Sequence, residues 1–206
     1  METFNYSVIK SGMIKSSQYP EFNWDGTTSA DTNFLQSLYE KMKVEYPKYY
    51  KMNELCQSGV LSALLSLPKN YEVDYDPDKL GLIVQNNSSS LVSDFPYSKE
   101  YYCTREKIYQ PKPSLFTYTL PNILIGEICI KQKLLGENFF FISEEFDLEP
   151  ILDEVRFLFE TGVLEGCLIG WAEVNPDNIN NFFFFLTPDS FNNHQLGEQI
   201  NQLYFH

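Results

Sequence analysis

The chain has 206 residues and a formal charge of −13, with 28 acidic against 15 basic side chains, and it contains 17 Phe, 14 Tyr and 2 Trp. A chain of this length can bury roughly 70% of the surface of its unfolded form, so its core requires no disulfide or metal. The negative charge argues against nucleic acid and anionic membranes as direct partners, because both bind basic surfaces. We expect one domain over residues 1–206.

The first residues have neither the positive charge nor the apolar stretch of a secretory signal, and no apolar run approaches the about 20 residues that cross a bilayer. We therefore expect a cytoplasmic protein. The cysteines and histidines are far apart in the sequence, at Cys56, Cys103, Cys129, Cys167, His194 and His206. This spacing fits no zinc site, so we interpret the cysteines as small buried apolar residues and expect no metal or cofactor.

Short apolar runs alternate with segments of helical period, which is typical of an α/β domain built around a largely buried sheet. The predicted strands, in chain order, are residues 6–10, 80–85, 138–142, 167–173 and 181–186. The predicted helices are residues 31–44, 52–67, 122–134, 151–160 and 196–203. Each helix carries apolar residues three and four positions apart, as a helix packed on a core does.

Two regions interrupt this pattern. Residues 11–29 are rich in Ser, Thr, Asn and Gly, which indicates a connecting segment. Residues 94–114 carry three prolines, four tyrosines and Phe95, and we predict an ordered loop, because so many aromatic residues are untypical of a disordered linker. The runs Phe139–Phe141 and Phe182–Phe185 predict strands that are covered on both faces.

Glu144, Glu145, Asp147 and Glu149 form the densest group of ionisable side chains. Such a group suits a divalent cation or a carboxylate acid and base, but it also suits the N-terminus of the helix that follows, where the helix dipole favours negative charge. We favour the helix interpretation, because no second cluster of oxygen ligands is visible. His194 lies in a polar turn and is interpreted as solvated. The common dinucleotide, phosphate-loop and serine-hydrolase motifs are absent.

Five groups of residues follow one another between positions 45 and 175: Lys48–Val60, Asp78–Asn86, Leu120–Ile128, Leu135–Phe139, and Thr161–Gly162 with Gly170–Glu173. In this order and spacing they resemble the N-terminal half of a β-ketoacyl synthase, an enzyme of the thiolase fold. These synthases condense an acyl chain with a malonyl unit on an acyl carrier protein. The resemblance implies a single thiolase-like repeat, with a mostly parallel five-stranded sheet and helices on its faces.

In this family a strand ends at the nucleophilic cysteine, which begins a buried helix. Alignment on Gly136, Gly162 and Gly170 places that position at Glu145, so the thiol that accepts the acyl group is absent. Pro150 follows five positions later, and its ring is expected to delay the start of the helix. The family's two catalytic histidines belong to a C-terminal half, so we expect this chain to be one repeat of a fold that normally contains two.

In complete synthases the strand that leads to the nucleophile pairs with its counterpart across a twofold axis. Here that strand is residues 138–142, so the resemblance implies a homodimer, or a heterodimer with a complete synthase; a plain buried central strand explains the same pattern. The segment 115–120 would lie near the dimer axis. The predicted contacts with a partner or an acyl pocket are Leu115, Phe116, Tyr118, Phe139, Phe140 and Phe141.

The first functional hypothesis is a non-catalytic partner of a β-ketoacyl synthase, similar to a chain length factor, in fatty-acid, polyketide or aryl-polyene-type synthesis. The alternatives are a residual malonyl decarboxylase and an acyl-binding or scaffold protein without a synthase partner. The decarboxylase is disfavoured, because an ionised Glu145 would repel the malonyl carboxylate. Acyl carrier proteins of this family are acidic and dock on basic surfaces, so with a charge of −13 this chain is expected to meet one only through its partner.

Overall fold

The computed structural model describes residues 4–25, 34–103, 112–175 and 178–205. A single sheet of six strands lies between two layers of helices, with the strand order β2-β1-β6-β5-β3-β4. The strands are β1 Asn5–Lys10, β2 Met13–Ser16, β3 Leu80–Asn86, β4 Asn138–Ile142, β5 Gly166–Asn175 and β6 Asn178–Leu186. All five predicted strands are present, and β2 is an addition at one edge.

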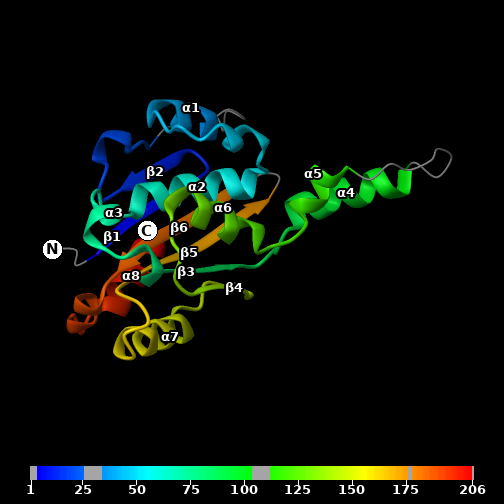
Figure 1. Ribbon diagram of the computed structural model, residues 1–206. Helices are drawn as coiled ribbons and strands as arrows, with labels where there is room; N and C mark the ends of the chain where they lie inside the picture. The colour runs from blue at the N-terminus through cyan, green and yellow to red at the C-terminus, as the bar shows by residue number, and fades with distance from the viewer. Residues whose placement is uncertain (1–3, 26–33, 104–111, 176–177, 206) are drawn as a thin grey trace.

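The α-helices are α1 Phe34–Lys41, α2 Glu54–Ser66, α3 Tyr71–Asp74, α4 Leu91–Cys103, α5 Pro113–Thr117, α6 Ile123–Gln132, α7 Leu148–Glu160 and α8 Leu196–Phe205. Four short 3₁₀ helices connect them: η1 Pro20–Phe22, η2 Pro47–Lys51, η3 Pro77–Lys79 and η4 Pro188–Asn192. Figure 1 shows α2 and α6 over one face of the sheet and α7 and α8 on the other, while α4 and α5 extend away from it. No helix in the described ranges is long and apolar enough to cross a bilayer.

The sheet is mixed, which differs from the mostly parallel five-stranded sheet that the resemblance implied. β3 pairs in parallel with both β4 and β5, whereas β6 is antiparallel to β5 and to β1. β5 and β6 stay paired as far as Asn175 and Asn178, which lie opposite each other. β1, β3, β4 and β5 therefore share one direction, and β6 opposes them.

The aromatic residues of β6 fill the core on both sides of the sheet. Phe183 and Phe185 pack with α2 and α6, and Phe182 and Phe184 pack with α7 and α8. All four side chains are buried, as the sequence predicted. A Cβ atom on Gly170 of β5 would lie 2.4 Å from the Phe183 ring, so this neighbour must be glycine for the ring to lie flat on the strand.

The prediction of a strand that is covered on both faces was wrong for the aromatic run of β4. Phe139 and Phe140 are half-buried and Phe141 is exposed, because β4 is an edge strand with β3 as its one neighbour among the described strands. Because β4 has a neighbouring strand of the described chain on one side only, its three consecutive aromatic side chains are not all covered. The alternative of a plain central strand is thereby excluded.

Two further expectations need correction. The loop predicted at 94–114 is wrong for its two described ends: α4 includes Pro96 and extends to Cys103, and α5 begins at Pro113. Residues 104–111 lie outside the described ranges. The helix predicted at 151–160 begins earlier, at Leu148, so Pro150 does not delay it. Proline is tolerated in the first turn of a helix because the amide that it lacks would have no partner there.

Candidate functional site

The turn after β4, Ser143–Asp147, contains the position at which the resemblance places a nucleophile. Glu145 is exposed in this turn, and its carbonyl oxygen accepts a hydrogen bond from Ser143 Oγ at 2.8 Å. Asn87, in the loop after β3, donates its side-chain amide to the carbonyl oxygen of Glu144 at 3.0 Å. The turn is thus held against the carboxyl end of β3.

Gln85 makes a second connection between these loops. Its Nε2 donates to the carbonyl oxygen of Asp147, and the Asp147 amide donates to Gln85 Oε1, both at 3.0 Å. Gln85 is buried in β3, so this pair of bonds fixes the residue that precedes α7. The start of α7 is set by the sheet rather than by the turn alone.

Glu173, near the end of β5, lies at the same carboxyl end of the strands and contacts the loop after β3. Its carboxylate accepts the backbone amides of Asn87 at 2.9 Å and Ser88 at 3.2 Å, and also the Ser88 hydroxyl. Adjacent backbone amides of this kind can stabilise an oxyanion in an enzyme. Here the protein's own carboxylate occupies them, so these two amides are not available to a reacting oxygen. Sequence analysis found Glu173 only as part of the family resemblance.

The four residues of the acidic group, Glu144, Glu145, Asp147 and Glu149, are all exposed. Within the described ranges, no three His, Cys, Asp or Glu side chains are arranged to hold a metal ion. Asp147 is the N-cap residue of α7 and Glu149 lies in its first turn. This placement agrees with the helix-dipole interpretation.

Among the thiols that the structure describes, those of Cys56, Cys129 and Cys167, none is activated. Cys56 and Cys167 are buried, and burial raises the pKa of both thiols well above the usual range. Burial also raises the pKa of Cys129 to about 11. The interpretation as buried apolar residues is confirmed for Cys56 and Cys167, Cys129 is half-buried, and the side chain of Cys103 lies outside the described part of the chain. His194 is exposed, as expected for a solvated residue.

The predicted contact residues fall into two groups. Leu115 and Phe116 lie on α5, where Phe116 is 51% exposed and its ring lies 5.9 Å from that of Tyr97 on α4. On β4, the rings of Phe139 and Phe141 stack at 6.1 Å. Among the ring contacts of the described residues, none joins the two groups.

The hydroxyl group of Tyr118 takes part in a buried polar cluster that the sequence did not predict. Glu127 on α6 is only 3% exposed, and its Oε1 lies 2.8 Å from Lys48 Nζ. The hydroxyl groups of Tyr118 and Tyr46 donate to the two Glu127 oxygens, each at 3.2 Å. The cluster compensates a buried charge and ties the segments around residues 46–48 and 118 to α6. No spacing in the sequence joins these residues, because they meet only in three dimensions.

The open edge of β4 is the clearest unpartnered surface in the described structure. Phe141 is 42% exposed and Ile142 is 60% exposed. The carbonyl of Glu137 and the amide of Ser143 bond to β3, so the alternate residues Asn138, Phe140 and Ile142 direct their backbone groups away from the sheet. An apolar strand with unpaired backbone groups is a template for pairing with another strand.

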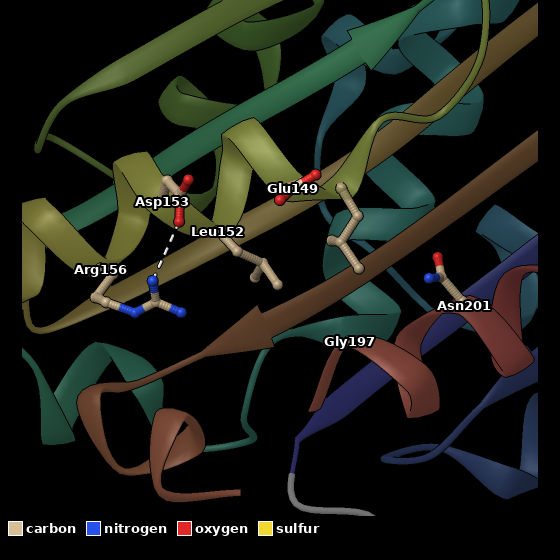
Figure 2. Close-up of a pocket in the computed structure, with 7 residues that line it drawn as sticks. Glu149, Leu152, Asp153, Arg156, Gly197 and Asn201 are labelled. Carbon is tan, nitrogen blue, oxygen red and sulfur yellow. Dashed lines mark hydrogen bonds and ion pairs between the residues drawn. The ribbon is translucent and has the colours of Figure 1, made fainter. Parts of the chain in front are cut away.

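The outer face of α7 is charged. A groove of about 420 Å³ lies between α7 and α8. Asp153 and Arg156, which form an ion pair at 3.1 Å, lie on its rim (Figure 2). The groove is lined by Leu148, Glu149, Leu152, Asp153, Arg156, Gly197 and Asn201. α7 thus buries one side, with Ile151 and Val155 in the core, and presents this charged side to solvent.

No protein-family model and no curated protein matches this sequence. Solved structures do resemble the chain, among them the following three. The ishigamide ketosynthase/chain length factor has a TM-score of 0.65 and 14% identity, over 89% of this chain and 61% of that one. The ketosynthase ApeO in complex with its chain length factor ApeC, from Xenorhabdus doucetiae, has a TM-score of 0.56 and 11% identity, over 91% of this chain and 79% of that one.

The third structure is the AntDE:AntF complex of a type II polyketide synthase ketosynthase with its acyl carrier protein, with a TM-score of 0.60 and 12% identity, over 94% of this chain and 63% of that one. These likenesses show that the chain has the ketosynthase-like thiolase fold. The chain spans less than two thirds of the first of these structures, at 61%.

Proposed function

We propose that this chain is a non-catalytic ketosynthase-like subunit, comparable to a chain length factor, that pairs through β4 with a complete β-ketoacyl synthase. The observation that carries the proposal is the open apolar edge of β4, with Phe141 and Ile142 exposed beside outward-facing backbone groups. Structures of the same fold that contain a ketosynthase together with a chain length factor support this kind of partner.

Several features support a role without catalysis. The nucleophile position of the family holds Glu145, and a carboxylate forms no thioester with an acyl group. The nearby amides of Asn87 and Ser88 are occupied by Glu173. In this proposal the acyl chemistry belongs to the partner, no cofactor is needed, and an acyl carrier protein is reached only through the partner.

Residues 1–206 would then form one ketosynthase-type repeat that acts in the cytoplasm, in fatty-acid, polyketide or aryl-polyene-type synthesis. Phe139, Phe140 and Phe141 would contact the partner through β4. Leu115 and Phe116 on α5 would reach its acyl pocket, while Tyr118 would support them from the Glu127 cluster.

The pairing is tested by co-expression with each complete β-ketoacyl synthase of the source genome, followed by affinity capture on a tag at this chain. The variant Phe141→Glu places a charge on the open edge and is expected to reduce the captured synthase at least about tenfold. Phe157→Glu is the matched control, because Phe157 is likewise an exposed phenylalanine, 58% exposed, that lies on α7 and not on the open strand. Failure of every synthase to bind, or equal loss in both variants, would contradict the proposal.

The absence of catalysis is tested separately. The chain alone and its Glu145→Ala variant are incubated with malonyl acyl carrier protein, and carbon dioxide release is measured. Neither protein is expected to release carbon dioxide above the rate without protein. Release by the wild type that disappears in Glu145→Ala would show a decarboxylase and would contradict the non-catalytic role.

A further inference from the structure

The geometry of β4 restricts how a second copy of this chain could pair with it. A closed pair of identical chains has a twofold axis, so two copies of one edge strand would run antiparallel. The residues with outward backbone groups are Asn138, Phe140 and Ile142, and these must form the new hydrogen bonds. The register that uses all three residues places Phe140 opposite Phe140 of the second copy, and Asn138 opposite its Ile142.

This register brings like charges together at both ends of the strand. It sets Glu137 opposite Ser143 of the second copy, so Glu137 of each copy would lie one residue from Glu144 of the other and close to Glu145. These three side chains are exposed. Paired strands lie about 4.8 Å apart, so carboxylates at these neighbouring positions are expected to approach within about a Debye length, about 8 Å at physiological ionic strength, and to repel each other.

The cations nearest to this strand in the sequence do not offset these charges. Lys133 Nζ lies 3.5 Å from Glu72 Oε2, and Lys131 Nζ lies 5.6 Å from the centre of the Tyr46 ring. Both lysines are therefore engaged on the α6 side of the molecule. On the other side of the turn, Asp147 and Glu149 add further negative charge.

We infer that the β4 edge rejects a second copy of this chain and selects a different chain, whose edge strand is apolar and carries basic side chains at its ends. The apolar residues Phe141 and Ile142 provide the contact area, and the acidic side chains Glu137, Glu144 and Glu145 decide which strand can approach. This inference rests on the proposed pairing through β4 and adds the charge of the partner to it.

The test uses the full chain and a charge-reversed copy of it as a defined partner. Sedimentation velocity compares the wild type with Glu137→Gln/Glu144→Gln/Glu145→Gln, and then with an equimolar mixture of the wild type and Glu137→Lys/Glu144→Lys/Glu145→Lys. The control Glu160→Gln/Asp189→Asn/Glu198→Gln removes the same number of exposed charges from α7, η4 and α8. Circular dichroism spectra establish that each variant is folded.

The wild type and the control variant are expected to remain monomers, and the neutralised variant to self-associate at least about tenfold more tightly than either. The mixture is expected to form a one-to-one pair that weakens as salt is added, and Phe141→Glu in either chain is expected to prevent it. A wild-type dimer at low salt as tight as that of the neutralised variant, or a mixed pair that salt leaves unchanged, would overturn the inference.

The two proposals fail in different ways. If a synthase is captured and Phe141→Glu releases it, but the mixture with the charge-reversed copy does not pair, the inference on charge is wrong and the proposed function stands. If neither the mixture nor any synthase pairs with this chain, both are wrong.

Discussion

At one edge of the sheet β2 is covered by the chain itself, whereas at the other edge β4 has β3 on one side and no strand of the described chain on the other. Ile14 of β2 exchanges two backbone hydrogen bonds with Trp24, at 2.7 and 2.8 Å. The amide of Ser16 donates to Asn23 Oδ1 at 2.7 Å. Both outward groups of Ile14 and the amide of Ser16 are therefore satisfied within the chain, whereas the outward groups of β4 have no partner among the described residues.

The difference indicates that the open edge has a use. Exposed edge strands invite uncontrolled pairing, and proteins usually cover them, shorten them or place charge on them. This chain uses the segment around η1 to cover the β2 edge, but it leaves three aromatic residues and Ile142 on β4. The acidic residues at both ends of β4 then act as protection against the wrong partner, without closing the edge to the right one.

The largest expected effect comes from a proline at the open edge. Ile142→Pro removes one outward amide from β4 and leaves the bonds to β3 intact, because proline is tolerated where the amide faces away from the sheet. Affinity for the synthase partner is expected to fall on the order of 100-fold, about 2.7 kcal/mol, measured by calorimetric titration. The denaturant midpoint of the isolated chain is expected to change little.

The control for this variant is Ile142→Ala, which keeps the amide and removes only side-chain contact. It is expected to weaken binding by less than Ile142→Pro. Equal losses in the two variants would show that the side chain alone mediates the contact, and the pairing of backbone groups would be wrong.

The closed edge predicts a smaller effect, on stability instead of binding. Asn23→Ala leaves the amide of Ser16 without its acceptor, and Ser16 is 3% exposed, so the free energy of unfolding is expected to fall by about 1–2 kcal/mol. Asn23→Asp retains an oxygen acceptor and is expected to stay close to the wild type. Chemical denaturation measures both, and a similar loss in the two variants would contradict the role assigned to Asn23 Oδ1.

The sequence predicted most of the framework because its strands are short apolar runs with clear boundaries. The run Asn138–Ile142 was located to the residue. β2 was missed, because Met13–Ser16 contains Lys15 and a serine and lies in a segment of turn-forming composition. α4 was missed because Pro96 and the clustered tyrosines obscured its helical period. For β2, the backbone bonds with β1 and Trp24 decided the local structure.

The site was predictable only in part. Local order in the sequence placed Glu145 in the turn after β4, and the resemblance identified that turn. The contacts of Glu173 with Asn87 and Ser88, and those of Glu127 with Lys48, link positions far apart in the chain. No periodicity reveals such pairs. The sequence also could not predict that β4 is an open edge strand, because an aromatic run has the same pattern at an edge and in the middle of a sheet.

The smallest effect is expected at alkaline pH. It compares a tyrosine that supports the open edge with one that supports the closed edge. Burial and the Glu127 carboxylate raise the pKa of Tyr46 from 10.0 to about 12, and Tyr46 anchors α6, which contacts β4. Burial, with Glu21, also raises the pKa of Tyr19, which packs on Phe22 at the closed edge.

In each case the folded state holds the proton more tightly than the unfolded state. The stability that these tyrosines contribute is therefore complete below about pH 10, and for Tyr46 it is lost as the pH rises toward about 12. Tyr46→Phe and Tyr19→Phe cannot ionise, so each is expected to lose stability less steeply than the wild type over this range, measured by urea midpoints at closely spaced pH values. If stability falls with pH as steeply in both variants as in the wild type, neither hydroxyl contributes. If the slope changes in Tyr19→Phe alone, the closed edge is the alkali-sensitive part of the fold, and the α6 support of β4 is not.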